Sequence, residues 1–354
     1  GVSSNHRRIK SLNLVYKNNK VKYSVNNLNT WFELPNNFNL IIGNSDKRGI
    51  WFKNRRYAGE LRVSLNDEKL NIINYLKLEK YLKSVVGSEM PKEFPLAALQ
   101  AQAIAARTYA LKLLDKNKLF DLYSTEASQV YLGLESETVK INRAVRSTRS
   151  LALFYNNKLI NALFHSSSGG RTENSGQVWK YQLPYLKSVI DYDQNSPKYR
   201  WTKKFTSAEL EKVFPDLGGL NSIQITNKSN TDRVFDIRLY GTNGNKIISG
   251  KTLRKKLKLL STKFEFDLKF NEVNLDNKSN FDNQIVDNLL PLPLPLPLPL
   301  PPIPTDYSLL VIGYGAGHGV GMSQWGAKFM AERGSGFRHI LKHYYTGAKI
   351  KTYY

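Results

Sequence analysis

The chain has 354 residues, 41% of them hydrophobic and 12% aromatic, with a formal net charge of +23 and no cysteine. This composition is sufficient for a sizeable core and excludes a disordered chain, disulfides, thiol catalysis and cysteine-ligated zinc. The charge serves solubility and also indicates an anionic partner. Lysine and arginine are spread along the chain without a recognisable nucleic-acid motif, which favours anionic wall polymers or an anionic membrane face over nucleic acid.

Residues 1–75 contain short alternating or β-branched runs separated by asparagine-rich turns, which predicts a β-rich N-terminal part. The last two runs, 58–65 and 70–75, predict a hairpin with its turn at 66–68. No apolar run long enough to cross a membrane occurs in the sequence, so we predict no transmembrane helix within it.

Two predicted helices follow, with an acidic residue between them. Apolar residues recur at helical spacing over 78–86, and we expect this helix to end at Gly87. The stretch 96–114 consists mostly of strong helix formers and predicts the second helix. Glu89 lies between them among apolar residues. A carboxyl group held in such surroundings is a candidate general acid near neutral pH, whereas a solvated structural glutamate is the alternative.

The middle of the chain predicts a hairpin that presents small hydroxyl side chains. Residues 135–150 predict a helix, and 151–164 predict a hairpin around Asn156-Asn157, because such a pair tolerates positive φ. At its end stands the stretch 165–170, HSSSGG, whose small residues would let a polysaccharide approach, although an ordinary loop is the alternative. A serine hydrolase is disfavoured, because the spacing provides neither a nucleophile elbow nor a third group.

Residues 193–282 differ in residue pattern from the preceding part and predict a second α+β segment. Its predicted helices are at 207–214 and 249–260, and its predicted strands are at 223–226 and 234–240. The basic residues of 249–260 indicate a solvated face or a neighbour of an anionic wall. The stretch 281–305 is of low complexity, and its alternating leucine and proline exclude a helix or central strand. We expect an extended tether there with no catalytic role.

The C-terminal part begins with alternating glycines over 313–321, a spacing that matches neither a P-loop nor a dinucleotide fingerprint. Ser323 predicts the N-cap of a helix that continues through Arg333. His339 and His343 have a spacing that can ligate zinc, but no general-base glutamate stands between them. We therefore predict no metal.

Three blocks, in this order, resemble the stage II sporulation protein D family. They are YLKSVVGSEMPKEFPLAALQAQAIAARTYAL at 81–111, ALFHSSSGGRTENSGQVW at 162–179, and GYGAGHGVGMSQWGA at 313–327 with the tail ILKHYYTGAKI at 340–350. The resemblance is clear over 57–192 and 307–354, and weak before 57 and over 193–306.

The resemblance implies a lytic transglycosylase of peptidoglycan in which Glu89 alone is the catalytic acid and base, with no cofactor. Candidate substrate-binding residues in the matching segments are Arg107, Gln129, Tyr131, Ser167, Ser168, Gly169, His318, Ser323 and Gln324. For Arg107 the alternative is a buried arginine that ties its helix to the fold, for Gln129 an amide that stabilises a turn, and for His318 a structural histidine. If Glu126 or Asp191 approached Glu89, inverting hydrolysis would become possible. Some relatives place zinc ligands at 124–128, but this chain has none of those cysteines or histidines there.

The resemblance also implies partners and a location. The substrate would be glycan strands stripped of stem peptides, with stage II sporulation protein P as amidase partner and stage II sporulation protein M as membrane scaffold. The location would be the extracytoplasmic face of the mother cell's engulfing membrane, through an N-terminal anchor that we expect to be missing from this sequence. Two other classes stay open, namely a non-catalytic amidase enhancer and a cationic cell-wall-binding module.

We predict an α+β fold in which a mixed helix and sheet catalytic core and a second α+β lobe flank a glycan cleft. The predicted parts are a β-rich N-terminal part at 1–75, a catalytic core with Glu89 at 76–192, a second lobe at 193–280, a Leu/Pro insertion or tether at 281–306, and a C-terminal part completing the core at 307–354.

Overall fold

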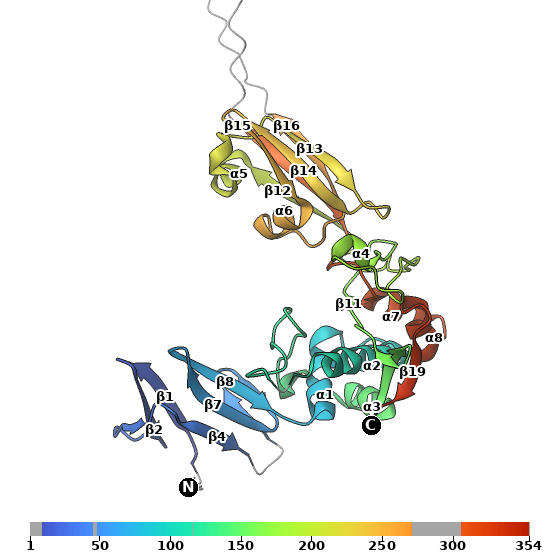
Figure 1. Cartoon of the computed structure of the whole chain (residues 1–354). Coiled ribbons are helices and arrows are strands. Elements are labelled where there is room, and N and C mark those ends of the chain that lie inside the picture. The colour runs from blue at the N-terminus through green and yellow to red at the C-terminus, as the bar shows by residue number, and fades with distance from the viewer. Residues whose placement is uncertain (1–8, 45–47, 116, 271–305, 354) are drawn as a thin grey trace, which may run out of the picture. The chain divides into compact units, whose positions relative to one another are not determined.

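The computed structural model describes residues 9–44, 48–115, 117–270 and 306–353, so the predicted Leu/Pro tether lies outside the described residues. The chain divides into two compact units, which we call unit 1 (1–162, 331–342 and 347–354) and unit 2 (163–330 and 343–346). Both contain helices and antiparallel sheets (Figure 1), which confirms the predicted α+β class. The division after 162 falls within the segment 76–192, and the five-part domain scheme stays a prediction.

The N-terminal part of unit 1 consists of strands, as predicted. Its strands are β1 (Leu12–Lys17), β2 (Lys20–Val25), β3 (Phe32–Leu34), β4 (Asn39–Gly43), β5 (Ile50–Phe52), β6 (Arg55–Tyr57), β7 (Glu60–Asn66) and β8 (Lys69–Tyr75). They form the sheets β1-β2-β3 and β4-β7-β8 and the hairpin β5-β6. Val21 and Val63, each on the inward face of its strand, form a shared core with Phe38, the residue before β4. The predicted hairpin at 58–75 is β7-β8.

The helical part of unit 1 contains α1 (Leu78–Glu89), α2 (Leu96–Leu113), the 3-10 turn η1 (Leu134–Ser136) and α3 (Val139–Ser147). α2 packs against α1, α3 and β9 (Leu151–Tyr155), and its many alanines permit this close approach on several sides (Figure 1). β9 pairs with β10 (Lys158–Leu159) and β19 (Lys349–Thr352). The predicted turn at Asn156-Asn157 is confirmed, with φ of 48° and 60°.

Unit 2 is built around two three-stranded sheets, β12-β17-β16 and β13-β14-β15, which share one apolar core with α5 and α6. Its elements are β11 (Phe164–His165), α4 (Ser175–Val178), β12 (Arg200–Thr206), α5 (Ser207–Val213), η2 (Pro215–Leu217), β13 (Ser222–Lys228), β14 (Val234–Gly241), β15 (Gly244–Ser249), α6 (Gly250–Lys256), β16 (Phe264–Phe270), β17 (Tyr307–Tyr314) and β18 (Met322–Ser323). The residues of α7 (Gln324–Glu332) and α8 (Phe337–Tyr344) are divided between the units. The short strands β11 and β18 pair in parallel.

Three predicted helix boundaries were wrong. α1 continues through Gly87 to Glu89. The single helix expected at 135–150 is η1 followed by α3, because Thr138 caps α3 by accepting the N–H of Ile141. The basic helix expected at 249–260 ends at Lys256.

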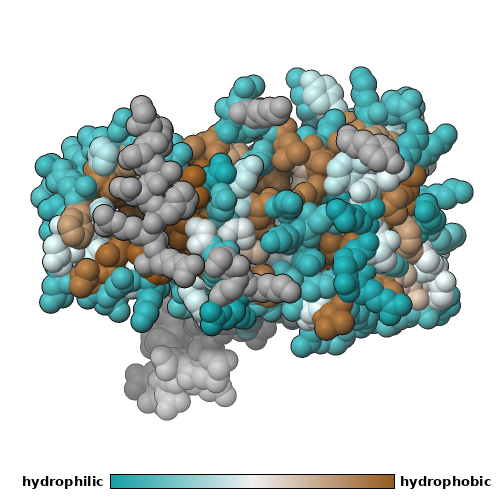
Figure 2. Space-filling view, turned by 90° about the horizontal axis from the view of Figure 1, so that it is seen from below, coloured by the Kyte–Doolittle hydropathy of each residue, from teal (hydrophilic) through white to brown (hydrophobic). Residues whose placement is uncertain are grey.

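The surface carries exposed large hydrophobic side chains in addition to its many charges. Figure 2 shows hydrophobic patches among predominantly hydrophilic residues on the face that it presents. Among the described residues, Trp51 has the most exposed tryptophan side chain, at 67%. Scattered exposure of this kind is normal, so a single exposed ring needs further support before it indicates binding.

Candidate active site and the buried polar network of unit 2

Glu89 is the last residue of α1 in unit 1. The helix passes through Gly87, where it packs closely against η1. A Cβ at this position would lie 2.0 Å from the carbonyl oxygen of Ser136, so only glycine permits this contact. The helix ends at Met90, which is extended with φ −126° and ψ 142°. The following Pro91 disfavours helical backbone at the residue before it. The chain thus places Glu89 at a helix C-terminus by a local steric rule.

Glu89 is half-buried, and its carboxylate contacts Val130 in the segment 129–136. Its Oε1 accepts the backbone N–H of Val130 over 2.7 Å, and the neighbouring N–H of Leu132 donates to Oγ of Ser88 over 3.2 Å. The Glu89 side chain is thus anchored to the backbone of this neighbouring segment.

Gln129 and Tyr131 flank this contact and are buried. Gln129 accepts the hydroxyl of Tyr81 over 3.0 Å and donates to the carbonyl oxygen of Ala106 over 3.3 Å. Tyr131 donates to Asn74 over 2.5 Å. Burial raises the pKa of Tyr81 and of Tyr131, and the nearby charge of Glu89 adds to the rise for Tyr81. Both predicted binders thus have structural contacts, and their substrate roles stay predictions.

Arg107 is fully buried in α2 and binds a glutamate of α1. Its Nε and Nη2 donate to the two carboxylate oxygens of Glu79 over 2.7 and 2.9 Å, and Nη1 donates to the carbonyl oxygen of Leu151 over 3.2 Å. A planar guanidinium suits such a two-pronged contact. This arrangement is the structural alternative that the sequence left open for Arg107. Its substrate role stays a prediction.

In unit 2, residues 167–170 of the predicted stretch 165–170 bind two buried carboxylates. The Oγ of Ser167 and the backbone N–H groups of Gly169 and Gly170 donate to Asp193, the last two over 2.8 Å each. Both glycines have positive φ, of 76° and 96°, which favours glycine at these two positions. Sequence reasoning missed Asp193, although its spacing of two from Asp191 was a usable signal.

Asp191 binds the neighbouring serine from the other side. Its Oδ2 accepts the hydroxyl of Ser168 over 2.5 Å, and its Oδ1 accepts the hydroxyl of Tyr344 over 2.6 Å. Burial and the adjacent charge of Asp193 raise the pKa of Asp191. Ser168 and Ser167 are fully buried, so their hydroxyls hold the loop to these carboxylates. Substrate binding by these residues stays a prediction.

Two histidines and a buried arginine lie beside this loop. Nη2 of Arg233 donates to the carbonyl oxygen of Ser168 over 3.0 Å. Within the described residues, Nε and Nη1 of Arg233 and Nε2 of His165 are buried without hydrogen-bond partners. The centre of the His318 ring lies 5.3 Å from the centre of the Trp179 ring and 5.5 Å from the centre of the His165 ring. Sequence reasoning missed Arg233, whose partners are remote in sequence.

The predicted N-cap of α7 is confirmed. Oγ of Ser323 accepts the N–H of Gly326 over 3.2 Å, and Gln324 is the first residue of the helix. Both side chains are buried. Among the described residues no three carboxylate, histidine or cysteine side chains gather as a metal site would require. His343 instead contacts the carbonyl oxygen of Ile190 at 2.8 Å.

The structure therefore places the predicted site residues in two groups, one in each unit. Unit 1 holds Glu89 with Arg107, Gln129 and Tyr131, and unit 2 holds Ser167, Ser168, Gly169, His318, Ser323 and Gln324. Within unit 1, Gln129 and Tyr131 flank the residue that binds Glu89. The predicted glycan cleft flanked by the second lobe stays a prediction.

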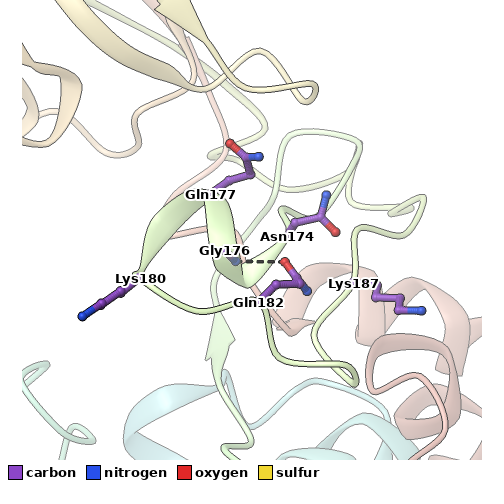
Figure 3. Close-up of a pocket in the computed structure, with 6 residues that line it drawn as sticks. All are labelled: Asn174, Gly176, Gln177, Lys180, Gln182 and Lys187. Atoms are coloured by element: carbon purple, nitrogen blue, oxygen red, sulfur yellow. Dashed lines mark hydrogen bonds between the residues drawn. The ribbon is translucent and has the colours of Figure 1, made fainter.

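An open pocket of about 540 Å³ lies in unit 2, and none of the predicted site residues lines it (Figure 3). It is lined by Asn174, Gly176, Gln177, Lys180, Gln182 and Lys187. The amide of Gln182 turns toward the backbone N–H of Gly176 and accepts it over 2.9 Å. Figure 3 shows Lys180 pointing away from the other lining residues, so its charge is not directed into the pocket.

The site and the α+β fold define a protein with a half-buried carboxylate at a helix end and a second, buried polar network. Residues 66–155 match the SpoIID family model, which is described as stage II sporulation protein. The chain is 35% identical over 298 residues to stage II sporulation protein D of Bacillus subtilis (strain 168), covering 78% of this chain and 75% of that protein. The chain therefore belongs to the stage II sporulation protein D family.

Two further relatives are similar to this chain over most of its length. Stage II sporulation protein D of Bacillus amyloliquefaciens is 34% identical over 299 residues, with 78% of this chain and 75% of that protein covered. The amidase enhancer of Bacillus subtilis (strain 168) is 29% identical over 291 residues, with 77% of this chain and 40% of that protein covered. None of the helices in the described part of the chain combines the length and apolar character needed to span a membrane.

Proposed function

We propose that the protein is a lytic transglycosylase that cleaves the bond between N-acetylmuramic acid and N-acetylglucosamine in peptide-stripped peptidoglycan strands during spore engulfment. The observation that carries the proposal is the half-buried Glu89 at a helix end, with one carboxylate oxygen bound to a backbone N–H. Membership of the stage II sporulation protein D family supports a role in sporulation.

The proposed reaction needs one carboxyl group. Protonated Glu89 donates its proton to the glycosidic oxygen as the bond from that oxygen to C1 of muramic acid breaks. The C6 hydroxyl oxygen then attacks C1 and gives its proton to the Glu89 carboxylate. The product is a 1,6-anhydro end, no water is consumed, and Glu89 ends in its starting protonation state. Ordinary glycosidases use two carboxyl groups at a defined separation.

The partners and location follow the same proposal. We propose that an amidase, stage II sporulation protein P, removes the stem peptides before cleavage and that stage II sporulation protein M provides a membrane scaffold. The site of action would be the extracytoplasmic face of the mother cell's engulfing membrane. The net charge of +23 supports an anionic wall or membrane surface as the neighbour.

A non-catalytic amidase enhancer is the second candidate, and the match to a protein of that name over 77% of this chain favours it. Such a protein would bind glycan and stimulate an amidase without using Glu89 for chemistry. A cationic wall-binding module is a third possibility, for which binding would weaken strongly with salt.

The experiment that tests the proposal incubates the purified protein, beside Glu89→Gln, with peptide-free glycan strands and identifies the products by mass spectrometry. Anhydro ends that are lost in the variant would support the transglycosylase. Reducing ends would mean hydrolysis and a second carboxylate. No cleavage by a folded protein that binds strands would favour the amidase enhancer.

A further inference from the structure

The hairpin β5-β6 in unit 1 presents an exposed indole with a cation over one of its faces. Trp51 is 67% exposed, and the guanidinium of its cross-strand partner Arg56 lies 5.6 Å from the centre of the indole ring. A cation over an aromatic face is attracted to it. With two thirds of its surface exposed and a cation over one face, the indole has its other face available to a ligand.

Arg56 is itself clamped by the turn η1. Nε of Arg56 donates to Oε1 of Glu135 over 2.8 Å, and the backbone N–H of Arg56 lies 3.2 and 3.1 Å from the two carboxylate oxygens. Although partial burial would raise the pKa of Glu135, these contacts with Arg56 hold it below its usual range. The clamp therefore persists at neutral pH and limits the freedom of the indole.

The turn that clamps Arg56 belongs to the segment that binds Glu89. Gly133 in this segment must be glycine, because a Cβ would lie 2.2 Å from the carbonyl oxygen of Arg56. A few residues earlier, Val130 donates its N–H to Glu89. The segment 129–136 thus connects the hairpin to the candidate acid through short contacts at both ends.

We propose that Trp51 is a sugar-stacking subsite for the N-acetylated glycan strand on which Glu89 acts. This inference rests on the proposed function. The C–H face of a pyranose ring packs on the negative face of an aromatic ring, and a ring that is already fixed loses little entropy on binding. The hairpin lies outside the residues 66–155 that match the family model.

A membrane is the other partner that an exposed tryptophan beside cations could contact. The hairpin favours a sugar, because its other large apolar residues, Ile50 and Phe52, alternate to the opposite face and are partly buried. Phe52 packs toward Tyr57, with ring centres 6.4 Å apart. One exposed ring matches one sugar, whereas interfacial insertion needs a larger apolar face.

The test measures binding of peptide-free glycan strands by calorimetry in the Glu89→Gln background, where no cleavage disturbs the titration. Trp51→Ala should weaken binding about tenfold or more, as removal of an aromatic anchor usually does. Trp51→Phe, which keeps a ring, should recover most of the affinity. Trp31→Ala is the matched control, because Trp31 is 45% exposed in the same unit, and its effect should stay within about twofold.

Three outcomes would overturn the subsite. The first is an affinity of Trp51→Ala for the strands within twofold of the parent protein. The second is an equal loss of affinity in the Trp51 and Trp31 variants. The third is a Trp51→Ala variant that binds vesicles of phosphatidylcholine and phosphatidylglycerol more weakly than the parent but binds the strands equally well. Thermal unfolding of each variant confirms that the fold is retained. If the wild-type protein makes no anhydro ends but Trp51→Ala still loses strand binding, the transglycosylase fails and the subsite stands.

Discussion

The rings of His165 and His318 lie 5.5 Å apart and bind opposite ends of a single residue, Val320. Nδ1 of His165 lies 3.2 Å from the Val320 carbonyl oxygen, and Nδ1 of His318 accepts the Val320 N–H over 3.0 Å. A carbonyl oxygen only accepts and an N–H only donates. His165 must therefore carry its proton on Nδ1, and a neutral His318 must carry its proton on Nε2.

We predict opposite tautomers for these two histidines at neutral pH, visible in the ring nitrogen shifts of an NMR spectrum. Burial and the charge of Arg233 lower the pKa of His318 to about 4, and burial and the nearby His318 lower that of His165 as well. Because the folded state resists protonation, the stability from His318 is present above the ordinary value of 6.5 and is lost as pH falls toward 4. Titration of either ring near 6.5 would contradict this arrangement.

Asp191 should give the opposite pH dependence. Its folded pKa lies above the ordinary 3.8, because it is buried beside Asp193, so its contribution to stability is greatest below 3.8 and is lost as pH rises through the folded value. The free energy of unfolding of the wild type relative to Asp191→Asn should therefore fall as pH rises above the ordinary value of 3.8. Denaturant unfolding at several pH values measures it, with Asp232→Asn as an exposed control. A difference that rises with pH would refute the direction of the shift.

Arg107→Met should destabilise unit 1. It removes a fully buried guanidinium from Glu79, whose side chain is 27% exposed, and it leaves carbonyl acceptors without their donor. We expect a loss of roughly 3 kcal/mol in the free energy of unfolding, at the lower end for broken buried ion pairs because Glu79 reaches water. Arg146→Met on the exposed face of α3 should have little effect. Unchanged stability with weakened strand binding would assign Arg107 to the substrate instead.

Gly87→Ala should destabilise the protein, although alanine normally stabilises a helix by about 1 kcal/mol relative to glycine. The added Cβ would lie 2.0 Å from the Ser136 carbonyl oxygen and would push η1 away from α1. Gly43→Ala is the control, since its Cβ would meet nothing within 4 Å. Thermal unfolding compares the two, and a Gly87→Ala protein as stable as the wild type would show that the contact is easily displaced.

Glu89→Gln should reduce anhydro-product formation by about 100-fold or more, the usual contribution of a general acid and base. The amide retains an oxygen that can accept the Val130 N–H, so the fold should be preserved. Glu126→Gln should retain activity, because the single-carboxyl reaction does not use it. Equal losses in both variants, measured as initial rates by mass spectrometry, would point to a two-carboxyl mechanism.

Local patterns predicted the elements whose causes are local. The turn at Asn156-Asn157, the long alanine-rich α2 and the Ser323 cap of α7 each depend on neighbouring residues, and all are confirmed. Gly87 could not be assigned correctly, because the residue that requires glycine there is Ser136, remote in sequence. The sequence identified Glu89 as a candidate general acid. Its Val130 partner and the Arg107–Glu79 pair depend on tertiary contacts that no spacing rule predicts.

The pairing of β16 with β17 sets Phe270 opposite Tyr307, so the chain leaves this sheet and returns to it at adjacent points. Strand pairing therefore holds Phe270 and Tyr307 side by side. Each doubling of the length of a flexible connection costs only about 0.6 kcal/mol in closure entropy. The connection between β16 and β17 is therefore a suitable insertion site. A fluorescent reporter or an affinity module can replace the native residues there without a change to the sheet.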